Sequence, residues 1–101
     1  MGAGRLYKTK PKVVKTAGQL ERHFKGVANH RRITILQIVF KNPGITLENI
    51  AENLDCNLKT ISEHTRRLVQ AGLLNKKHKG RSVAHSVSPY GKKFTDFIDR
   101  F

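Results

Sequence analysis

The chain has 101 residues, 38% of them hydrophobic, so it is long enough for one domain with a modest core and too short for two. Its 20 lysines and arginines outnumber seven acidic residues, and the formal net charge of +13 predicts a polyanionic partner. Nucleic acid is favoured over a membrane partner, because no apolar run approaches the roughly 20 residues needed to span a bilayer.

Residues 1–15 carry five cations, no acidic residue and Pro11, which interrupts any helix. This composition predicts an extended, mostly disordered basic arm that either contacts a minor groove or phosphates, or is an ordinary frayed terminus. We expect a cytoplasmic, nucleoid-associated protein, since the arm contains no apolar signal segment and a single cysteine, Cys56, suits a reducing compartment.

The folded part is expected over residues 16–101 and begins with a helix at residues 16–26. Thr16 and Gln19 have the spacing of a capping box, and Leu20 and Phe24 belong to a narrow apolar stripe. A second helix, residues 30–41, is expected to be the central core element, because its apolar residues cover most of its circumference. Those residues are Ile33, Ile35, Leu36, Ile38, Val39 and Phe40.

Two short helical patterns follow and are separated by only three residues, 55–57. The first, residues 46–54, has apolar residues at helical spacing after a Thr46 cap. The second, residues 57–71, has Asn57 as its cap and Gly72 as its end signal. Two short helices joined by so tight a turn predict a helix-turn-helix, whose second helix enters a DNA major groove.

The face of residues 57–71 opposite the apolar stripe supports this interpretation. It carries Lys59, Ser62, Glu63, Arg66 and Arg67, which include groups able to bind base edges and phosphates. The alternative is a short amphipathic helix whose basic face is merely solvated.

Residues 73–87 predict a β-hairpin. Leu73 and Leu74 form one short strand-like run, residues 83–87 form another, and Gly80 in the basic loop between them supplies a positive φ. A hairpin with cations over residues 76–81 is a wing suited to the sugar-phosphate backbone; the alternative is a basic surface loop. The predicted fold class is therefore mainly α with a small β-hairpin wing.

A last helix begins at Ser88-Pro89 and runs to Phe101. Its apolar residues recur at i, i+3, i+4 and i+7, so they form a ridge that must be buried. We expect this ridge to join the first helix in a homodimer, through Leu20, Phe24, Phe94, Phe97, Ile98 and Phe101. The alternative is burial against the chain's own first helix.

Residues 24–89 resemble the ArsR-type winged helix-turn-helix repressors. The agreement is densest in the second short helix and the start of the wing, at Thr60, Ser62, His64, Leu68, Ala71, Gly72 and Leu73. The segment 88–92 is similar to the one after the wing in MarR-like and HxlR-like relatives. The resemblance implies a dimer in which the first and last helices make the contact.

The chain also departs from this family. Residues 46–54 hold no Cys or His, and the last helix has Asp96 and Asp99 but no His, so the metal sites of many ArsR-type proteins are not expected. Cys56 occupies an apolar position and is interpreted as a small core residue. Leu58 stands where the family usually has a polar base reader, and Glu63 where it often has Arg.

These observations predict a DNA-binding transcriptional regulator, most simply a repressor, that binds an inverted-repeat operator as a homodimer and needs no cofactor. The alternatives are an architectural or non-specific nucleic-acid binder, or a winged helix that serves only as a protein–protein module. An enzyme is not expected, because no catalytic constellation is recognisable. The predicted DNA-binding residues are Asn57, Leu58, Lys59, Thr60, Ser62, Glu63, Arg66, Arg67, Lys76, Lys77, Lys79 and Arg81.

Overall fold

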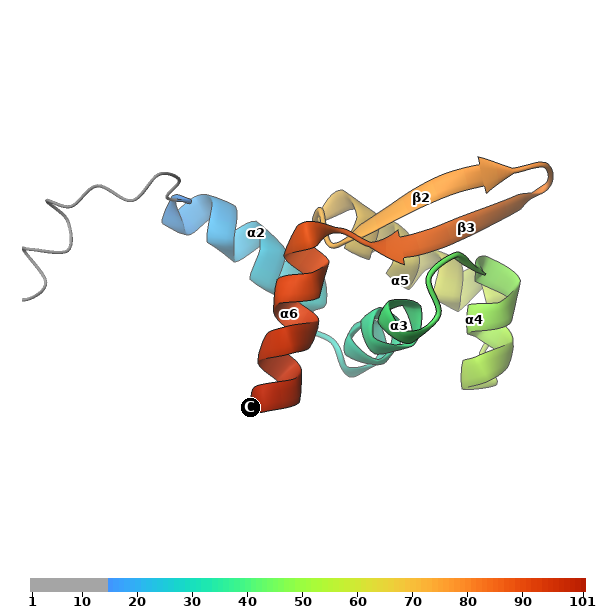
Figure 1. The fold of residues 1–101 in the computed structure, drawn as a ribbon, viewed down its shortest axis with the longest axis horizontal. Coiled ribbons are helices and arrows are strands. Elements are labelled where there is room, and N and C mark those ends of the chain that lie inside the picture. The colour runs from blue at the N-terminus through green and yellow to red at the C-terminus, as the bar shows by residue number, and fades with distance from the viewer. Residues whose placement is uncertain (1–14) are drawn as a thin grey trace, which may run out of the picture.

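The computed structural model describes residues 15–101, which form five helices and three strands (Figure 1). In chain order these are α2 (Ala17–Val27), α3 (His30–Lys41), β1 (Ile45–Thr46), α4 (Leu47–Leu54), α5 (Leu58–Gln70), β2 (Leu74–Lys79), β3 (Ser82–Val87) and α6 (Pro89–Arg100). The predicted fold class, mainly α with a β-hairpin wing, is confirmed. The basic arm predicted over residues 1–15 lies, apart from Lys15, outside the described residues.

Polar caps set the helix starts where the sequence places them. Thr16 Oγ1 accepts from Gln19 N at 3.1 Å while Gln19 Oε1 accepts from Thr16 N at 2.9 Å, which completes the predicted capping box of α2. The Asn29 side chain accepts from two backbone N–H groups in the first turn of α3. Thr46 and Ser88 cap α4 and α6 in the same way.

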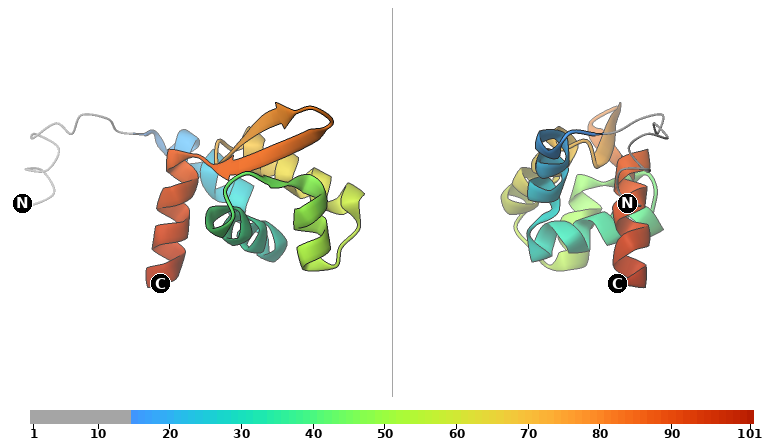
Figure 2. Two further views of the ribbon diagram at one scale, coloured as in Figure 1. Left: turned by 45° about the vertical axis from the view of Figure 1, so that its right-hand side comes forward. Right: turned by 90° about the vertical axis from the view of Figure 1, so that its left-hand side faces the viewer.

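The core is built around α3, as predicted. Ile35 and Leu36 have no exposed surface and contact apolar side chains of the other helices and the sheet. In both views of the long side of the molecule, α3 lies between α6 and α4 (Figures 1 and 2). The largest fully buried side chains are Ile35, Leu36, Val39, Ile50, Ile61, Leu68, Leu73, Leu74 and Thr95. Each apolar one contributes about 1.5–3 kcal/mol through burial.

The sheet differs from the predicted hairpin in two ways. Its strand order is β1-β3-β2, all antiparallel, and the two-residue β1 beside His85 and Ala84 was missed because so short a strand has no recognisable pattern. The basic segment expected as a loop is mostly strand: pairing runs from Leu74↔Val87 to Lys79↔Ser82, and only Gly80 and Arg81 form the turn. The positive φ predicted for Gly80 is confirmed at 61°. Pairing with β3 overrides the weak strand propensity of a lysine-rich segment.

The end of α5, the start of β2 and the start of α6 meet at one junction. Gly72 has φ 78°, and Leu73 N donates to Leu68 O at 2.9 Å, so α5 ends in the glycine cap that the sequence predicts. Ser88 N donates to Leu73 O at 3.1 Å, and Ser88 Oγ donates to Gly72 O at 2.6 Å. Gly91 is required here, because a Cβ at this position would overlap the Leu73 carbonyl oxygen.

No helix within residues 15–101 is both long enough and apolar enough to cross a membrane.

Candidate nucleic-acid interface

The turn between α4 and α5 holds the two helices in a fixed relation. Asp55 takes the left-handed conformation at φ 50°, which Asp tolerates better than most residues, and Cys56 N donates to Ala51 O at 3.0 Å. Asn57 then starts α5, its side chain accepting from Lys59 N at 2.7 Å and from Thr60 N. The α5 stripe of Ile61, Thr65 and Leu68 is buried, so the remaining face of this helix points outward.

All twelve residues predicted to bind DNA are exposed, eight of them on α5 and its cap and four on the hairpin. Leu58 lies at the first turn of α5, beyond the edge of the core, and is 45% exposed, so although it is apolar it does not join the buried stripe. The structure therefore brings a continuous polar face to α5, with one exposed leucine near its start.

An ion-pair network on α5 was not foreseen from the sequence. Glu63 Oε2 accepts from Arg66 Nη2 at 2.6 Å and from Arg67 Nε at 3.3 Å. These hydrogen bonds hold the pKa of the Glu63 carboxyl below its usual value. The i,i+3 and i,i+4 spacing of the three residues is the signal that identifies the network.

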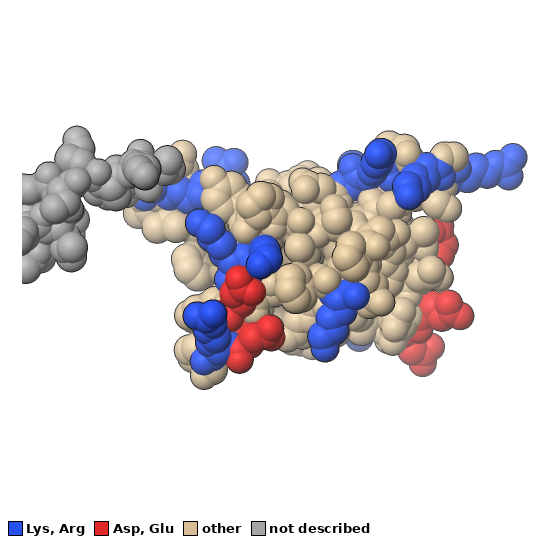
Figure 3. Space-filling model, viewed as in Figure 1, with Lys and Arg blue, Asp and Glu red and all other residues tan. Residues whose placement is uncertain are grey.

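The register of the hairpin distributes its cations over both faces. Lys76 is the cross-strand partner of His85 and Lys77 that of Ala84, so alternation along β2 sends neighbouring lysines to opposite faces. Figure 3 shows Lys and Arg gathered along the hairpin, at the upper right, and acidic residues gathered below it over the α4 side. Helix α4 supplies Glu48 and Glu52 and no basic residue. The molecule is thus electrically polarised across the helix-turn-helix.

A second group of basic residues lies where α3 begins beside α5. Arg32 donates through Nε to His64 Nδ1 at 3.3 Å and through Nη1 to Gly26 O at 3.1 Å. Burial and the nearby Arg32 and Arg31 lower the pKa of His64. Arg31 contacts the Cys56 sulfur. Cys56 is half-buried against the core, so its interpretation as a core residue holds on one side only.

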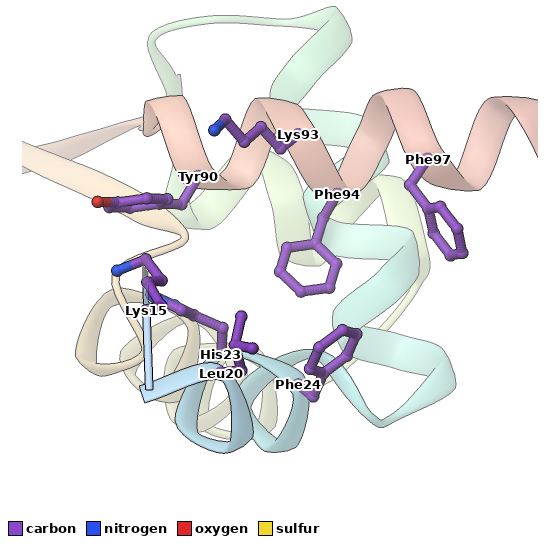
Figure 4. Close-up of a pocket in the computed structure, with 8 residues that line it drawn as sticks. All are labelled: Lys15, Leu20, His23, Phe24, Tyr90, Lys93, Phe94 and Phe97. Carbon is purple, nitrogen blue, oxygen red and sulfur yellow. The ribbon is translucent and has the colours of Figure 1, made fainter. Parts of the chain in front are cut away.

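The surface shared by α2 and α6 is apolar and open. Phe24 and Phe94 line a hollow of about 290 Å³, and their rings pack edge to face with centroids 5.3 Å apart (Figure 4). Phe94 packs against the core and Ile98 is half-buried, whereas Phe97 is 58% and Phe101 95% exposed. The predicted ridge is therefore divided: Phe94 is packed against the core and the Phe24 ring, whereas Phe97 and Phe101 are left exposed.

Within residues 15–101, no three His, Cys, Asp or Glu side chains are grouped so that they could hold a metal ion.

Comparisons with known proteins agree with this geometry. Residues 29–75 match the family model described as winged helix-turn-helix DNA-binding. HlyU from Vibrio cholerae is 22% identical with a TM-score of 0.77, over 87% of this chain and 96% of that one. The homodimeric winged helix-turn-helix DNA-binding domain of a possible ArsR-family transcriptional regulator from Mycobacterium bovis is 24% identical with a TM-score of 0.74, over 81% and 76% of the two chains.

A further relative is an uncharacterized protein of Methanocaldococcus jannaschii, 31% identical over an alignment of 68 residues that covers 62% of this chain and 26% of that protein. The chain thus spans about a quarter of the length of this relative. At identities of 22% and 24% the solved structures establish the fold. The segment that matches the family model, residues 29–75, covers α3, β1, α4, α5 and the first two residues of β2.

Proposed function

We propose, from the premise that this chain is a winged helix-turn-helix protein, that it is a cytoplasmic, nucleoid-associated transcriptional repressor and not an enzyme. The observation that carries the proposal is the exposed polar face of α5 beside a lysine-rich hairpin. Helix α5 enters the major groove, and the hairpin lies on the sugar-phosphate backbone.

The residues divide by the contact each can make. Lys59 and Ser62, near the start of α5, reach base edges and set sequence preference. Lys77, Lys79 and Arg81 bind phosphates whatever the sequence, because a phosphate carries no base information. Asn57, Leu58, Thr60, Glu63, Arg66, Arg67 and Lys76 complete the interface.

The repressor acts as a homodimer joined by α2 and α6. Support comes from the exposed Leu20, Phe24, Phe97 and Phe101 and from the similar Mycobacterium bovis domain, which is homodimeric. A two-fold axis places the two copies of α5 about 34 Å apart, one turn of DNA, so the operator is an inverted repeat.

A second candidate function is non-specific or architectural DNA binding on the same fold. The net charge of +13 favours it, because counterion release alone gives strong sequence-independent affinity. The two functions differ in the ratio of affinities for one sequence over random competitor, which is on the order of 10³ or more for a specific regulator.

The test is selection of bound duplexes from a random library, followed by titration of alanine variants. Lys59→Ala and Ser62→Ala should relax base preference. Lys77→Ala and Arg81→Ala should weaken all sequences alike and lower the salt slope by about one unit per lost contact. Lys92→Ala, which removes an exposed cation from α6, is the charge-matched control and should leave binding unchanged. Unaltered binding in all four interface variants would refute the assignment of α5 and the hairpin.

A further inference from the structure

A groove of about 350 Å³, lined by both polar and apolar side chains, lies between α5 and the hairpin. Helix α5 contributes Ser62, Arg66 and Gln70 to its wall, and the sheet contributes Lys76 and His85. Two cations from different elements thus face one hollow that is open at the surface where α5 and the hairpin meet. Such a hollow suits a compact anion of high charge density.

His85 is the unexplained residue of this groove. It sits on the central strand between Ile45 and Lys76 and is 4% exposed. Its Nδ1 is buried with no hydrogen-bond partner, the one such side-chain atom in residues 15–101. A buried polar atom left without a partner costs free energy, so its presence needs a reason.

Burial, more than the surrounding charges, favours a neutral His85 ring in the free chain. Burial lowers the pKa of His85 most strongly and the Lys76 cation lowers it further, against smaller raising effects from the nearby backbone of Ile45 and Val83 and from the Glu48 carboxylate on α4. Arg66 lines the same groove, although one of its guanidinium nitrogens is bonded to Glu63 at 2.6 Å. An arginine has five N–H donors, so the remaining ones are available to an anion.

We propose that this groove holds one phosphate of the DNA backbone, bound by Arg66 and Lys76, and that His85 beneath it takes up a proton when that phosphate arrives. The inference rests on the proposed DNA binding and adds a site and a linkage to it. A phosphate bound in the groove offsets the charge of the two cations and places an anion near His85. This stabilises the imidazolium form of His85. DNA affinity therefore rises as pH falls through the histidine range, by at most about tenfold per pH unit for one linked proton.

The experiment follows the histidine ring resonances of the whole chain by NMR as a function of pH, free and with a saturating DNA duplex. The expected result is a rise of at least about one unit in the pKa of His85 on DNA binding. Isothermal titration calorimetry at pH 7 in two buffers of different ionisation enthalpy should show proton uptake. His85→Gln should abolish this uptake, whereas His78→Gln, an exposed histidine on the same hairpin, should retain it.

Three outcomes bear on the inference. If the duplex binds and the His85 pKa stays unchanged, the groove does not hold a phosphate and the inference is overturned. If inorganic phosphate alone, at matched ionic strength, raises the pKa as much as the duplex does, the site belongs to a free anion and the assignment to DNA is overturned. Absence of duplex binding at every pH refutes the proposed function itself, a result distinct from both. The wild-type titration needs no variant, so the test holds even where His85→Gln fails to fold.

Discussion

Glu63 restrains the two cations that follow it on α5. It is the single acidic residue of that helix, and both of its hydrogen-bond partners, Arg66 and Arg67, are predicted DNA-binding residues. A carboxylate in this position fixes the two guanidinium groups in one arrangement and repels phosphates. Glu63 therefore favours DNA sites that match the fixed positions of the two arginines, and it lowers the affinity for duplexes of random sequence.

Glu63→Gln should raise affinity for random duplex DNA by roughly fivefold, the worth of one close charge pair in water, and should steepen the salt slope. Filter binding or fluorescence anisotropy across a salt series measures both quantities. The ratio of the affinity for the selected operator to the affinity for random DNA should fall at the same time. A variant with weaker random binding would mean that Glu63 instead positions the arginines for every sequence.

The buried histidine also governs stability of the free chain. Because the pKa of His85 is lowered in the folded state from its usual 6.5, the unfolded chain binds more protons between the folded pKa and about pH 6.5. The free energy of unfolding should therefore fall as pH drops from 6.5 towards the folded pKa, and His64 acts in the same direction. Urea titrations at pH 7.5, 6.5 and 5.5 check this, and His85→Gln should show a flatter dependence. Stability that increases on acidification would contradict the buried neutral ring.

At the scale of elements, most helix starts and ends could be predicted from the residues at those positions. Thr16, Asn29, Asn57 and Ser88 each cap a helix with a side chain one can recognise from type and spacing alone, and Gly72 ends α5 as expected. What could not be predicted depends on partners distant in sequence.

Four features show this limit. The strand β1 exists only because β3 lies beside it, and β2 extends through its lysines only because β3 pairs with it. The groove formed by α5 and the hairpin needs the packing of both, so His85 shows no sequence signal beyond its residue type. The close approach of α2 to α5 is likewise invisible: a Cβ on Gly26 would overlap the side chain of Ala71.

Gly91→Ala tests the junction between α6 and β2. The added methyl would overlap the Leu73 carbonyl, so the backbone has to shift and the variant should lose about 1–3 kcal/mol of unfolding free energy. Gly18→Ala is the matched control, since its surroundings on α2 are open; it should gain about 0.4–1 kcal/mol. Chemical denaturation of both variants gives the comparison. Equal unfolding free energies of the two variants would show that the backbone at the junction shifts to accommodate the methyl group at no cost.

For the whole molecule, two opposing forces decide assembly. The exposed aromatic surface of α2 and α6 favours association, since burial of apolar area stabilises by about 25 cal/mol per Å² before the entropic cost of association. Repulsion between two chains of +13 opposes it and reaches farther at low salt. Because DNA would neutralise this charge, we expect dimerisation and operator binding to reinforce one another if the proposed dimer forms.

Phe97→Asp should convert the dimer to a monomer, because it places a carboxylate on a side chain that is 58% exposed within the isolated chain and buried in the proposed interface. Analytical ultracentrifugation at moderate salt, with and without operator DNA, measures the change. Circular dichroism confirms that the variant remains folded. Asn53→Asp, at an exposed position on α4, changes the net charge by the same amount and serves as the control. A wild-type monomer in both conditions would assign the aromatic surface to some other role.

The junction at Leu73 also determines how far such a dimer can adapt to its operator. Helix α6 is bonded through Ser88 to the backbone that ends α5, and Gly91 leaves no gap between them. In a dimer held by α6, the two copies of α5 therefore keep a fixed distance and orientation, because no flexible segment separates α5 from α6. Inserting one base pair at the centre of the operator turns one half-site by about 35° and moves it about 3.4 Å. A rigid dimer cannot follow that change. We therefore expect its DNA affinity to depend on half-site spacing as strongly as on the base sequence.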